Sequence, residues 1–348
     1  MAVGQVFDMT DVNLDALQQF LRVQFGEGEL SLEKISGGQS NPTYFVDYGD
    51  RRMVLRKKPA GEILRGAHAI DREFRVLRAL TPTGVPVPEP VLYHDGDDVL
   101  GTPFYLMQRL DGRVFEDCAL PDMPAEDRRG IYLAMAEALA KLHAIMPSEI
   151  GLGDYGPPGN YFDRQITRWT KQLRASPGKK IAALETVADW LPNNMPDDDG
   201  RVSIAHGDFR LGNLLFHPHK PEVIGILDWE LSTLGNPLAD LGFCCMPWHT
   251  APDEYGGILG LDHEGLGIPS QREFINHYFA HAIPTTPLAP FHLVFALFRF
   301  AVIFVGIADR ARLGNAVSNN AADVGPLAER FAFRALEILD GKHRWYKN

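Results

Sequence analysis

The sequence has few cysteines and no excess of positive charge. Only Cys118, Cys244 and Cys245 occur among 348 residues, and no pair has Cys-x-x-Cys spacing. This sparse, odd-numbered set excludes a disulfide framework and a cysteine-ligated zinc site, and it predicts a reducing compartment, the cytoplasm. The net charge of −11 argues against nucleic acid as a partner, because binding a phosphate backbone needs a basic surface.

Segments that would direct the chain to a membrane are also scarce. The first residues, "MAVGQVFDMTDVNLD", lack the basic start and apolar run of a signal peptide. One apolar run, "FHLVFALFRFAVIFVGIA" at residues 291–308, approaches the length of a membrane span but contains His292 and Arg299. Arginine near the centre of a span is costly, so the run predicts a buried core helix and no membrane partner.

Hydrophobic periodicity divides the chain into a strand-rich first third and a helix-rich remainder. The first part predicts helices at residues 11–25 and 68–80 around antiparallel strands, with a proline-rich connector at 81–90. After residue 110, helical spacing dominates, interrupted by strand-like pieces at 202–205, 213–217 and 222–228. We therefore predict an α+β protein with an N-terminal lobe at residues 1–110 and a helical lobe at 111–348.

Two aspartates and an asparagine lie in and beside the strand-like run "HGDFRLGNLLFHPHKPEVIGILDWE", residues 206–230. Carboxylates in such a half-buried run are costly unless they are paired or bind a metal. Asp208 and Asn213 are five residues apart, and Asp228 ends the next apolar strand. A kinase-type site places a base and a metal-binding amide at this spacing, followed by a second metal-binding carboxylate. The alternative is a well-paired turn without a metal.

At these residues the sequence resembles the aminoglycoside phosphotransferase and choline kinase superfamily of small-molecule kinases. "HGDFRLGNLLF" is similar to the catalytic loop of that superfamily, and "VIGILDWELSTLGNPLADLGF" is similar to its metal-binding segment. "VLRKKPAG" and "HAIDREFRVLRAL" are most similar to the kinase-like domain that is fused to acyl-CoA dehydrogenases in animals, and to its stand-alone bacterial relatives. The resemblance implies a two-lobed protein-kinase-like fold, with an N-lobe of antiparallel sheet plus helix and a mainly helical C-lobe. It also implies the cofactors ATP and Mg²⁺.

The resemblance gives the residues of the second lobe their roles. Asp208 matches the catalytic aspartate, while Asn213 and Asp228 match the Mg²⁺ ligands. Arg210 falls where protein kinases carry a lysine toward the γ-phosphate, although a salt-bridging arginine is the alternative. Asp240, in "PLADL", matches a structural aspartate that hydrogen-bonds the backbone of the catalytic loop.

In the first lobe the resemblance implies a cation on the third strand that pairs with a helix carboxylate. Arg56 aligns with the family lysine, with Lys58 as the alternative, and Glu73 is the expected partner. The backbone of Gln108 and Arg109 would meet adenine, an assignment that depends on position only.

The segment "SGGQSNPT", residues 36–43, replaces a glycine-rich phosphate loop. Gly37 and Gly38 allow positive φ and a close backbone approach to phosphate, and Ser40 and Asn41 follow them. A plain turn is the alternative.

The phosphate acceptor is the least constrained part of the prediction. Residues 245–345 would supply much of its pocket and are rich in apolar and aromatic residues, which also suit plain core packing: Phe274, Tyr278, Phe279, Phe295, Phe298 and Phe304. "WHT" at residues 248–250 is a further candidate for the pocket rim. This composition favours an apolar-bodied acceptor over a polycationic aminoglycoside.

We therefore predict a monomeric or homodimeric phosphotransferase that moves the γ-phosphate of ATP to a hydroxyl of a small molecule. A hydroxyacyl-CoA or hydroxy acid is the favoured acceptor. The alternatives are an aminoglycoside or amino-alcohol kinase, a catalytically silent nucleotide-binding scaffold and, ranked last, a kinase acting on a protein hydroxyl.

Overall fold

The computed structural model describes residues 12–35, 41–59, 69–157, 159–283, 286–312 and 325–341. It contains two compact units, Met1–Asp111 and Gly112–Asn348. The sequence placed this boundary near residue 110. Each unit is described by itself below.

Unit 1 is built on a five-stranded antiparallel sheet with strand order β1-β2-β3-β5-β4. Its strands are β1 (Leu30–Lys34), β2 (Thr43–Tyr48), β3 (Arg51–Lys57), β4 (Pro90–His94) and β5 (Phe104–Gln108), and its α-helices are α1 (Leu14–Phe25) and α2 (Ile70–Leu80). The sequence did not predict β4, because Pro90 ends the proline-rich stretch. Proline is compatible with the first residue of an edge strand, since its missing N–H costs no ladder bond there. The first three residues of the proline-rich connector, Thr81–Thr83, form a short 3₁₀ turn.

Helix α1 packs against one face of this sheet. The Asn13 side chain caps the helix by accepting a hydrogen bond from Ala16 N at 3.1 Å. Leu17 and Leu21, one turn apart, are fully buried in a cluster with Val46 and Leu55 of the sheet. The helical spacing seen in the sequence therefore marks the face that covers the strands.

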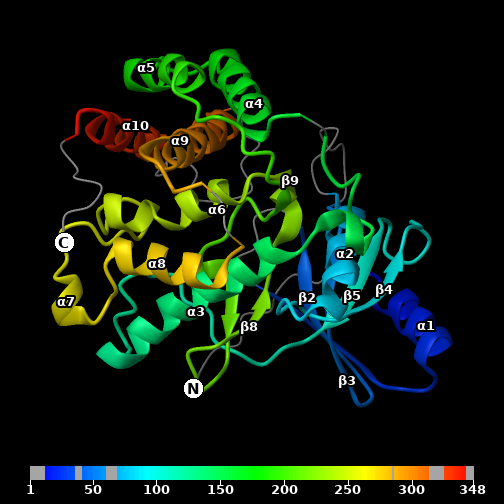
Figure 1. Cartoon of the computed structure of the whole chain (residues 1–348). Coiled ribbons are helices and arrows are strands. Elements are labelled where there is room, and N and C mark those ends of the chain that lie inside the picture. The colour runs from blue at the N-terminus through cyan, green and yellow to red at the C-terminus, as the bar shows by residue number, and fades with distance from the viewer. Residues whose placement is uncertain are drawn as a thin grey trace, which may run out of the picture. The chain divides into compact units, whose positions relative to one another are not determined.

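Unit 2 is mainly helical (Figure 1). Its α-helices are α3 (Ala125–Ala144), α4 (Tyr161–Ala175), α5 (Ala182–Trp190), α6 (Pro237–Cys244), α7 (His263–Leu266), α8 (Gln271–His281), α9 (Pro290–Arg312) and α10 (Gly325–Leu339). Two small antiparallel sheets position the loops between them: β6 (Ser203–Ala205) pairs with β9 (Thr233–Gly235), and β7 (Leu214–Phe216) pairs with β8 (Val223–Ile226). The sequence predicted strands at β6, β7 and β8 and missed the three-residue β9.

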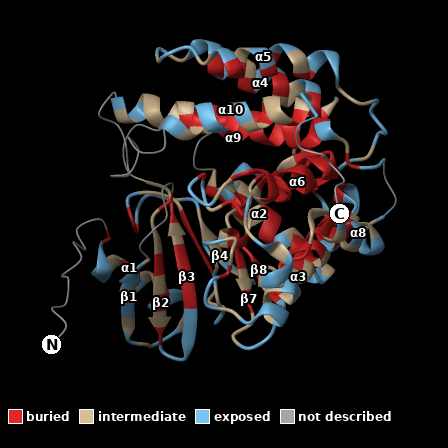
Figure 2. Ribbon diagram, turned by 90° about the vertical axis from the view of Figure 1, so that its left-hand side faces the viewer, coloured by how far each residue is buried: buried red, intermediate tan, exposed pale blue. Residues whose placement is uncertain are grey.

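Helix α9 contains the apolar run at residues 291–308 and packs against α4, α5, α6 and α10. By length and composition it could cross a membrane, but 72% of its most apolar window is buried inside the protein. Figure 2 shows many buried residues along α9 and α6. The burial of these side chains explains why the sequence of α9 is apolar, and it agrees with the prediction of a core helix.

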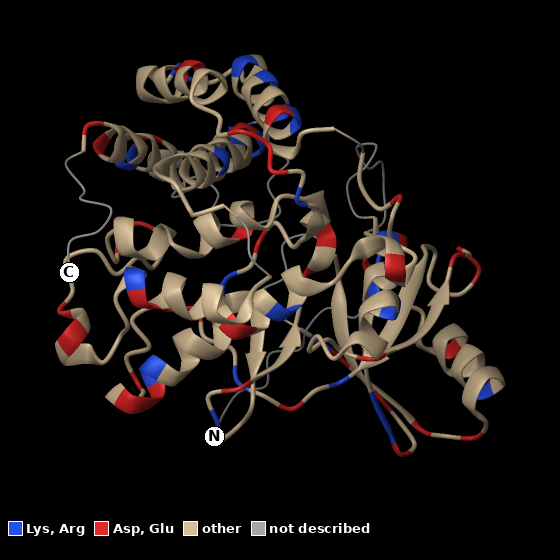
Figure 3. Ribbon diagram, in the orientation of Figure 1, with Lys and Arg blue, Asp and Glu red and all other residues tan. Residues whose placement is uncertain are grey.

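Charged residues of both signs are interspersed along the helices of unit 2 (Figure 3). Several of them form ion pairs, such as Arg174 with Glu185 and Asp189, and Arg330 with Asp253. Pairs this exposed add little to stability, because water screens them.

Candidate active site

The loop that follows β6, residues 206–213, carries Asp208 and is called the Asp208 loop below. Its second residue, Gly207, has a φ of +84°. A Cβ added there would lie 2.8 Å from the carbonyl oxygen of Leu231. Glycine is therefore required both by the backbone conformation and by the space available.

Asp208 faces Asn213 across this loop. The Asn213 Nδ2 group donates to the Asp208 carboxylate at 2.7 Å and to the Asp208 carbonyl oxygen at 2.9 Å. Both contacts to the carboxylate, from Asn213 and from Arg210, go to Oδ2, so Oδ1 has no partner among the described residues. Burial raises the pKa of Asp208, although the positive charge of Arg210 opposes this shift. The loop thus presents one open carboxylate oxygen.

His206 is fully buried and links the loop to the end of β8. Its Nε2 lies 2.9 Å from the carbonyl oxygen of Leu227, which can only accept, so this nitrogen carries the proton. Its Nδ1 then accepts the backbone N–H of Asp208 at 3.2 Å. The two contacts define a neutral tautomer of His206 and hold Asp208 beside the end of β8.

Asp228 lies just after β8 in the left-handed region, with φ 64° and ψ 62°. A non-glycine residue in this region costs about 1–3 kcal/mol and persists where the surrounding structure enforces it. The backbone N–H of Leu227 donates to the Asn213 carbonyl at 2.9 Å, which ties this turn to the Asp208 loop. Such strain is typical of functional positions.

The side-chain oxygens of Asn213 and Asp228, the predicted metal ligands, fit a hard cation. Both N–H bonds of the Asn213 amide point at Asp208, and its Oδ1 accepts no hydrogen bond from the described residues. Carboxylate and amide oxygens are the ligands that Mg²⁺ takes, whereas zinc sites favour histidine and cysteine. Asn213 and Asp228 are therefore suited to hold Mg²⁺.

Asp240, on α6, anchors the start of the loop. Its carboxylate accepts the backbone N–H groups of His206 and Gly207 at 2.6 and 2.9 Å, and the ring of His143 lies 3.3 Å away. Burial alone would raise the pKa of Asp240, but the contact with His143 and the backbone N–H bonds lower it overall. The structural role implied by the family resemblance agrees with these contacts.

Arg299 is a support that the sequence reasoning did not identify. From the apolar helix α9, its guanidinium donates to the carbonyl oxygen of Gly207. It is 6% exposed and lies over the Trp169 ring, 5.7 Å from the ring centroid. The signal was present in the sequence, because a single arginine inside an apolar run needs a buried acceptor.

Arg210 lies between two acidic side chains. Its Nε is 3.5 Å from Asp208 Oδ2, and its Nη1 is 3.4 Å from Glu116. Burial lowers the pKa of Arg210, but Asp208 and the other neighbouring groups raise it overall, so the guanidinium stays charged. Both interpretations of Arg210 agree with this geometry, since it pairs with Glu116 while remaining next to Asp208.

A pocket opens beside the Asp208 loop in unit 2, with an empty volume of about 620 Å³ that includes space open to solvent. Aromatic and sulfur side chains form most of its wall: Tyr132, Met135, Phe209, Phe243, Cys244, Met246, Phe300 and Phe331, with Cys118 and Tyr255. Its two acidic side chains are each matched by an arginine, because Glu116 pairs with Arg210 and Glu254 accepts two bonds from Arg334 at 2.8 and 3.1 Å. The pocket therefore presents little unpaired negative charge.

The aromatic residues singled out in the sequence do not line this pocket. Phe274, Tyr278, Phe295 and Phe298 are fully buried in the core, and Phe279 and Phe304 are also absent from the wall. Core packing was thus the correct interpretation for the buried members of that set. Of the "WHT" segment only Thr250 reaches the pocket.

In unit 1 the structure brings Arg56 and Glu73 together. Arg56 Nε lies 3.0 Å from Glu73 Oε2, and both side chains are largely buried. Glu73 also accepts from Asn41 Nδ2 at 2.9 Å and from the Tyr105 hydroxyl at 3.1 Å. These three donors fix the Glu73 carboxylate. The basic residue among them is Arg56 and not the alternative, Lys58.

Of the other residues expected at the nucleotide site, Gly37, Gly38 and Ser40 lie outside the described residues, whereas Gln108 and Arg109 lie within them. The backbone N–H groups of Gln108 and Arg109 donate to the carbonyls of Glu89 and Arg52 at 2.8 and 3.1 Å. These two amides are therefore already satisfied within unit 1, and adenine could meet only other atoms of the two residues.

Comparison with known proteins identifies curated relatives. Acyl-CoA dehydrogenase family member 10 of Mus musculus is 40% identical over 325 residues, covering 91% of this chain and 30% of the relative. The human family member 11 is 40% identical over 313 residues, covering 87% of this chain and 40% of the relative. The chain thus spans less than half of the length of these relatives.

Solved structures share the fold. A Ralstonia eutropha protein provisionally assigned as an aminoglycoside phosphotransferase has a TM-score of 0.85 and 42% identity, covering 94% of this chain and 98% of its own. Choline kinase from Cryptosporidium parvum has a TM-score of 0.66 at 12% identity, covering 94% and 96%. The aminoglycoside phosphotransferase APH(4)-Ia, solved with AMP-PNP and hygromycin B, has a TM-score of 0.61 at 15% identity, covering 92% and 98%. The last two likenesses concern the fold alone.

The family model of the phosphotransferase enzyme family matches residues 31–273. This range contains the Arg56–Glu73 pair, the Asp208 loop, Asp228 and Asp240. The chain belongs to the phosphotransferase enzyme family and has its kinase-like α+β fold.

Proposed function

We propose that the protein transfers the γ-phosphate of ATP, with Mg²⁺, to a hydroxyl group on a small molecule with an apolar body. The observation that carries this proposal is the open Oδ1 of Asp208 next to a pocket with a mainly apolar wall. Membership of the phosphotransferase family supports the reaction type, and a fold neighbour solved with AMP-PNP supports the nucleotide.

The transfer step needs little covalent chemistry from the protein. The acceptor hydroxyl oxygen forms a bond to the γ-phosphorus, the bond to the bridging oxygen breaks, and its electron pair leaves with ADP. Asp208 Oδ1 orients the hydroxyl and receives its proton, which a carboxylate of raised pKa does more readily. Mg²⁺, when bound by Asn213 and Asp228, would neutralise phosphate charge.

Arg210 suits the charge that develops on the phosphoryl group, because it keeps its charge and lies within 3.5 Å of the Asp208 carboxylate. In unit 1, Arg56 is held by Glu73, and its planar guanidinium can bind two phosphate oxygens of the nucleotide at once.

The acceptor that we favour is a hydroxyacyl-CoA or a hydroxy acid. A polycationic antibiotic would need unpaired acidic groups, and the two acidic residues of the pocket already face arginines. The relatives named as acyl-CoA dehydrogenase family members point in the same direction. An aminoglycoside or amino alcohol is the second candidate, because the relative at 42% identity carries that provisional assignment.

The test is ADP release with ATP and Mg²⁺ over hydroxyacyl-CoAs, hydroxy acids, amino alcohols, sugars and aminoglycosides. Wild-type protein and Asp208→Asn are compared with each acceptor. Turnover with hydroxyacyl compounds that the variant lacks supports the proposal, and turnover with aminoglycosides alone supports the second candidate. If no acceptor raises ADP release above the variant, the catalytic proposal fails, and tight ATP binding would then indicate a nucleotide-binding scaffold.

A further inference from the structure

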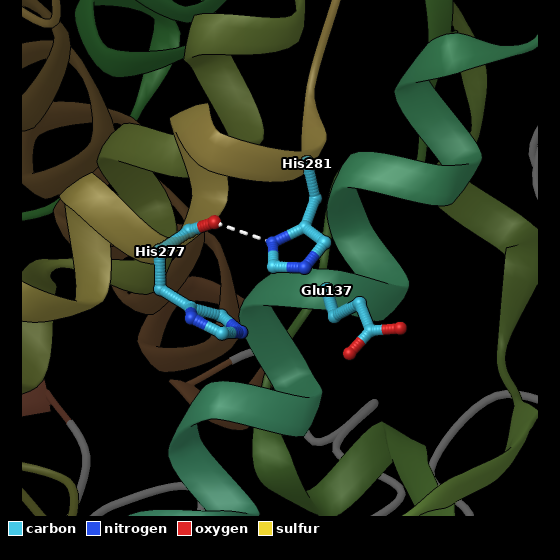
Figure 4. Close-up of side chains that lie close together, drawn as sticks. All are labelled: Glu137, His277 and His281. Carbon is cyan, nitrogen blue, oxygen red and sulfur yellow. Dashed lines mark hydrogen bonds between the residues drawn. The ribbon is translucent and has the colours of Figure 1, made fainter.

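Helices α3 and α8 pack against each other and bring two histidines to one glutamate. Glu137 comes from α3, and His277 and His281 come from successive turns of α8 (Figure 4). The i and i+4 positions of a helix lie on one face, so both rings point to the same side. One ligand atom from each of the three residues lies within 4.8 Å of those from the other two. The three belong neither to the apolar pocket nor to the contacts that hold the Asp208 loop.

The His281 ring is oriented as metal-binding histidines usually are. Its Nδ1 lies 2.9 Å from the backbone carbonyl oxygen of His277, which can only accept a hydrogen bond. Nδ1 therefore carries the proton, and Nε2 keeps its lone pair. Metal-ligating histidines commonly donate their second N–H to a carbonyl or carboxylate in this way, which fixes the tautomer and the direction of the ring.

The other two side chains also keep ligand atoms available. The ring centroids of His277 and His281 are 4.5 Å apart. The nitrogens of the His277 ring form no hydrogen bond with the described residues. Glu137 contacts Lys141 Nζ at 3.0 Å through Oε1, which leaves Oε2 open. With both rings unprotonated, the three groups offer two imidazole nitrogens and one negative charge.

We propose that Glu137, His277 and His281 form a binding site for a divalent transition metal of the zinc type. Imidazole nitrogens select such metals over Mg²⁺ and Ca²⁺, which prefer oxygen. Two histidines, one carboxylate and a water complete four-coordinate zinc. Zinc ligands at about 2.0–2.1 Å lie closer together than 4.8 Å, and these half-exposed or exposed side chains can close the difference by rotation.

The site joins two helices that support the Asp208 loop. His143 on α3 bonds the hydroxyl of Tyr278 on α8 at 2.9 Å, and the same His143 ring contacts Asp240. A metal at the Glu137 site would clamp this helix pair about two turns from His143 along α3. We therefore expect the metal to stabilise unit 2, and this inference does not depend on the proposed reaction.

The test is a zinc titration of the full chain after chelator treatment, by calorimetry and by competition with a chromophoric chelator. Excess Mg²⁺ is present throughout, so that zinc does not occupy the oxygen ligands of the Asp208 loop. We expect one equivalent to bind, and at least tenfold weaker binding in both His281→Ala and Glu137→Gln. Saturating zinc should raise the melting temperature of the wild type by roughly 3–6 °C and of neither variant.

The matched control is His219→Ala. His217 and His219 form another close pair of histidines, with ring centroids 6.2 Å apart, but no carboxylate completes a three-ligand group with them among the described residues. This control should bind zinc like the wild type. Absence of stoichiometric binding, or equal weakening in His219→Ala and His281→Ala, would overturn the proposal. Cobalt substitution adds a direct readout, because a four-coordinate site gives visible absorption that His281→Ala should lose.

Discussion

The Asp208 loop and the apolar pocket are adjacent in unit 2 but are built from different kinds of residue. Buried polar groups hold the loop. Asp240 accepts its backbone N–H groups, Arg299 donates to its carbonyl at Gly207, and His206 joins it to the end of β8. The pocket wall is mainly aromatic and sulfur side chains, and its acidic groups are paired. Directional bonds specify one geometry, whereas apolar contacts tolerate change. We infer that the loop fixes the reaction and that the pocket decides the acceptor.

The largest effect should come from Asp208→Asn. This isosteric change removes the carboxylate that orients the hydroxyl, so we expect kcat to fall by about 10²–10⁴-fold. The measurement is phosphate transfer at saturating ATP, with thermal unfolding as the control for folding. A variant that unfolds like the wild type yet retains more than a tenth of its kcat would remove Asp208 from the reaction.

Breaking the support of the loop should cost stability as well as activity. Asp240→Asn leaves buried N–H groups facing an amide, and we expect the free energy of unfolding to fall by about 3–5 kcal/mol. Urea unfolding measures this loss. Asp253→Asn is the matched control, because Asp253 pairs with Arg330 at the surface and should matter by less than about 1 kcal/mol. Equal losses in the two variants would show that the buried contacts add nothing.

Helix α9 serves both regions, and its buried His292 makes it sensitive to acid. Burial lowers the His292 pKa from 6.5 to about 4. Below pH 6.5 the unfolded chain takes up a proton that the folded protein does not take up until about pH 4. The contribution of His292 to the free energy of unfolding should therefore be fully present above pH 6.5. As the pH falls toward 4, the free energy of unfolding should decrease by up to about 3 kcal/mol.

The variant His292→Asn tests this acid sensitivity. Its side-chain oxygen can still accept the N–H of Ala289, which donates to His292 Nδ1 at 2.9 Å. Stability measured at several pH values should decline less in the variant over this window. Identical pH profiles for both proteins would rule out His292 as the source.

Changes in the pocket should affect acceptor binding more than chemistry. Phe331→Leu removes part of the aromatic wall on α10, and we expect the acceptor KM to rise about 3–10-fold while kcat changes by less than about twofold. Phe333→Leu is the control on the same helix, since Phe333 is 52% exposed and does not line the pocket. A fall in kcat without a change in KM would place Phe331 in the chemistry instead.

The smallest effect should come from Glu116→Gln, which removes an exposed charge at the pocket. For an acceptor with an apolar body we expect its KM to change by less than about threefold, because surface pairs contribute little. A cationic acceptor would lose an ionic contact instead. A rise of more than about tenfold with any active acceptor would therefore favour an amino alcohol or aminoglycoside.

Local spacing allowed much of the loop to be predicted from the sequence. The spacing of Asp208, Asn213 and Asp228 identified a segment whose residues the structure does bring together. The left-handed backbone of Asp228 and the contact of Arg299 with Gly207 depend on packing between segments far apart in the chain. No local pattern specifies such contacts, although a lone arginine in an apolar helix signals that one exists.

The pocket shows the limit of compositional reasoning. Aromatic residues in a helical lobe suit a core and a pocket equally well, and only the fold separates them. Phe298 and Phe300 are neighbours on α9, yet Phe298 is fully buried in the core and Phe300 lines the pocket. Helical rotation of about 100° per residue separates their directions. Assigning them required the positions of α6 and α10.

The most direct test of the central claim is the chemical identity of the product. Wild-type protein is incubated with ATP, Mg²⁺ and a hydroxyacyl-CoA, and the acceptor is analysed by mass spectrometry and phosphorus NMR. Our account predicts an acceptor heavier by one phosphoryl group and linked as a phosphate monoester at its hydroxyl, which Asp208→Asn does not form. ATP hydrolysis to free phosphate with every hydroxyacyl acceptor unchanged, while an aminoglycoside becomes phosphorylated, would contradict it.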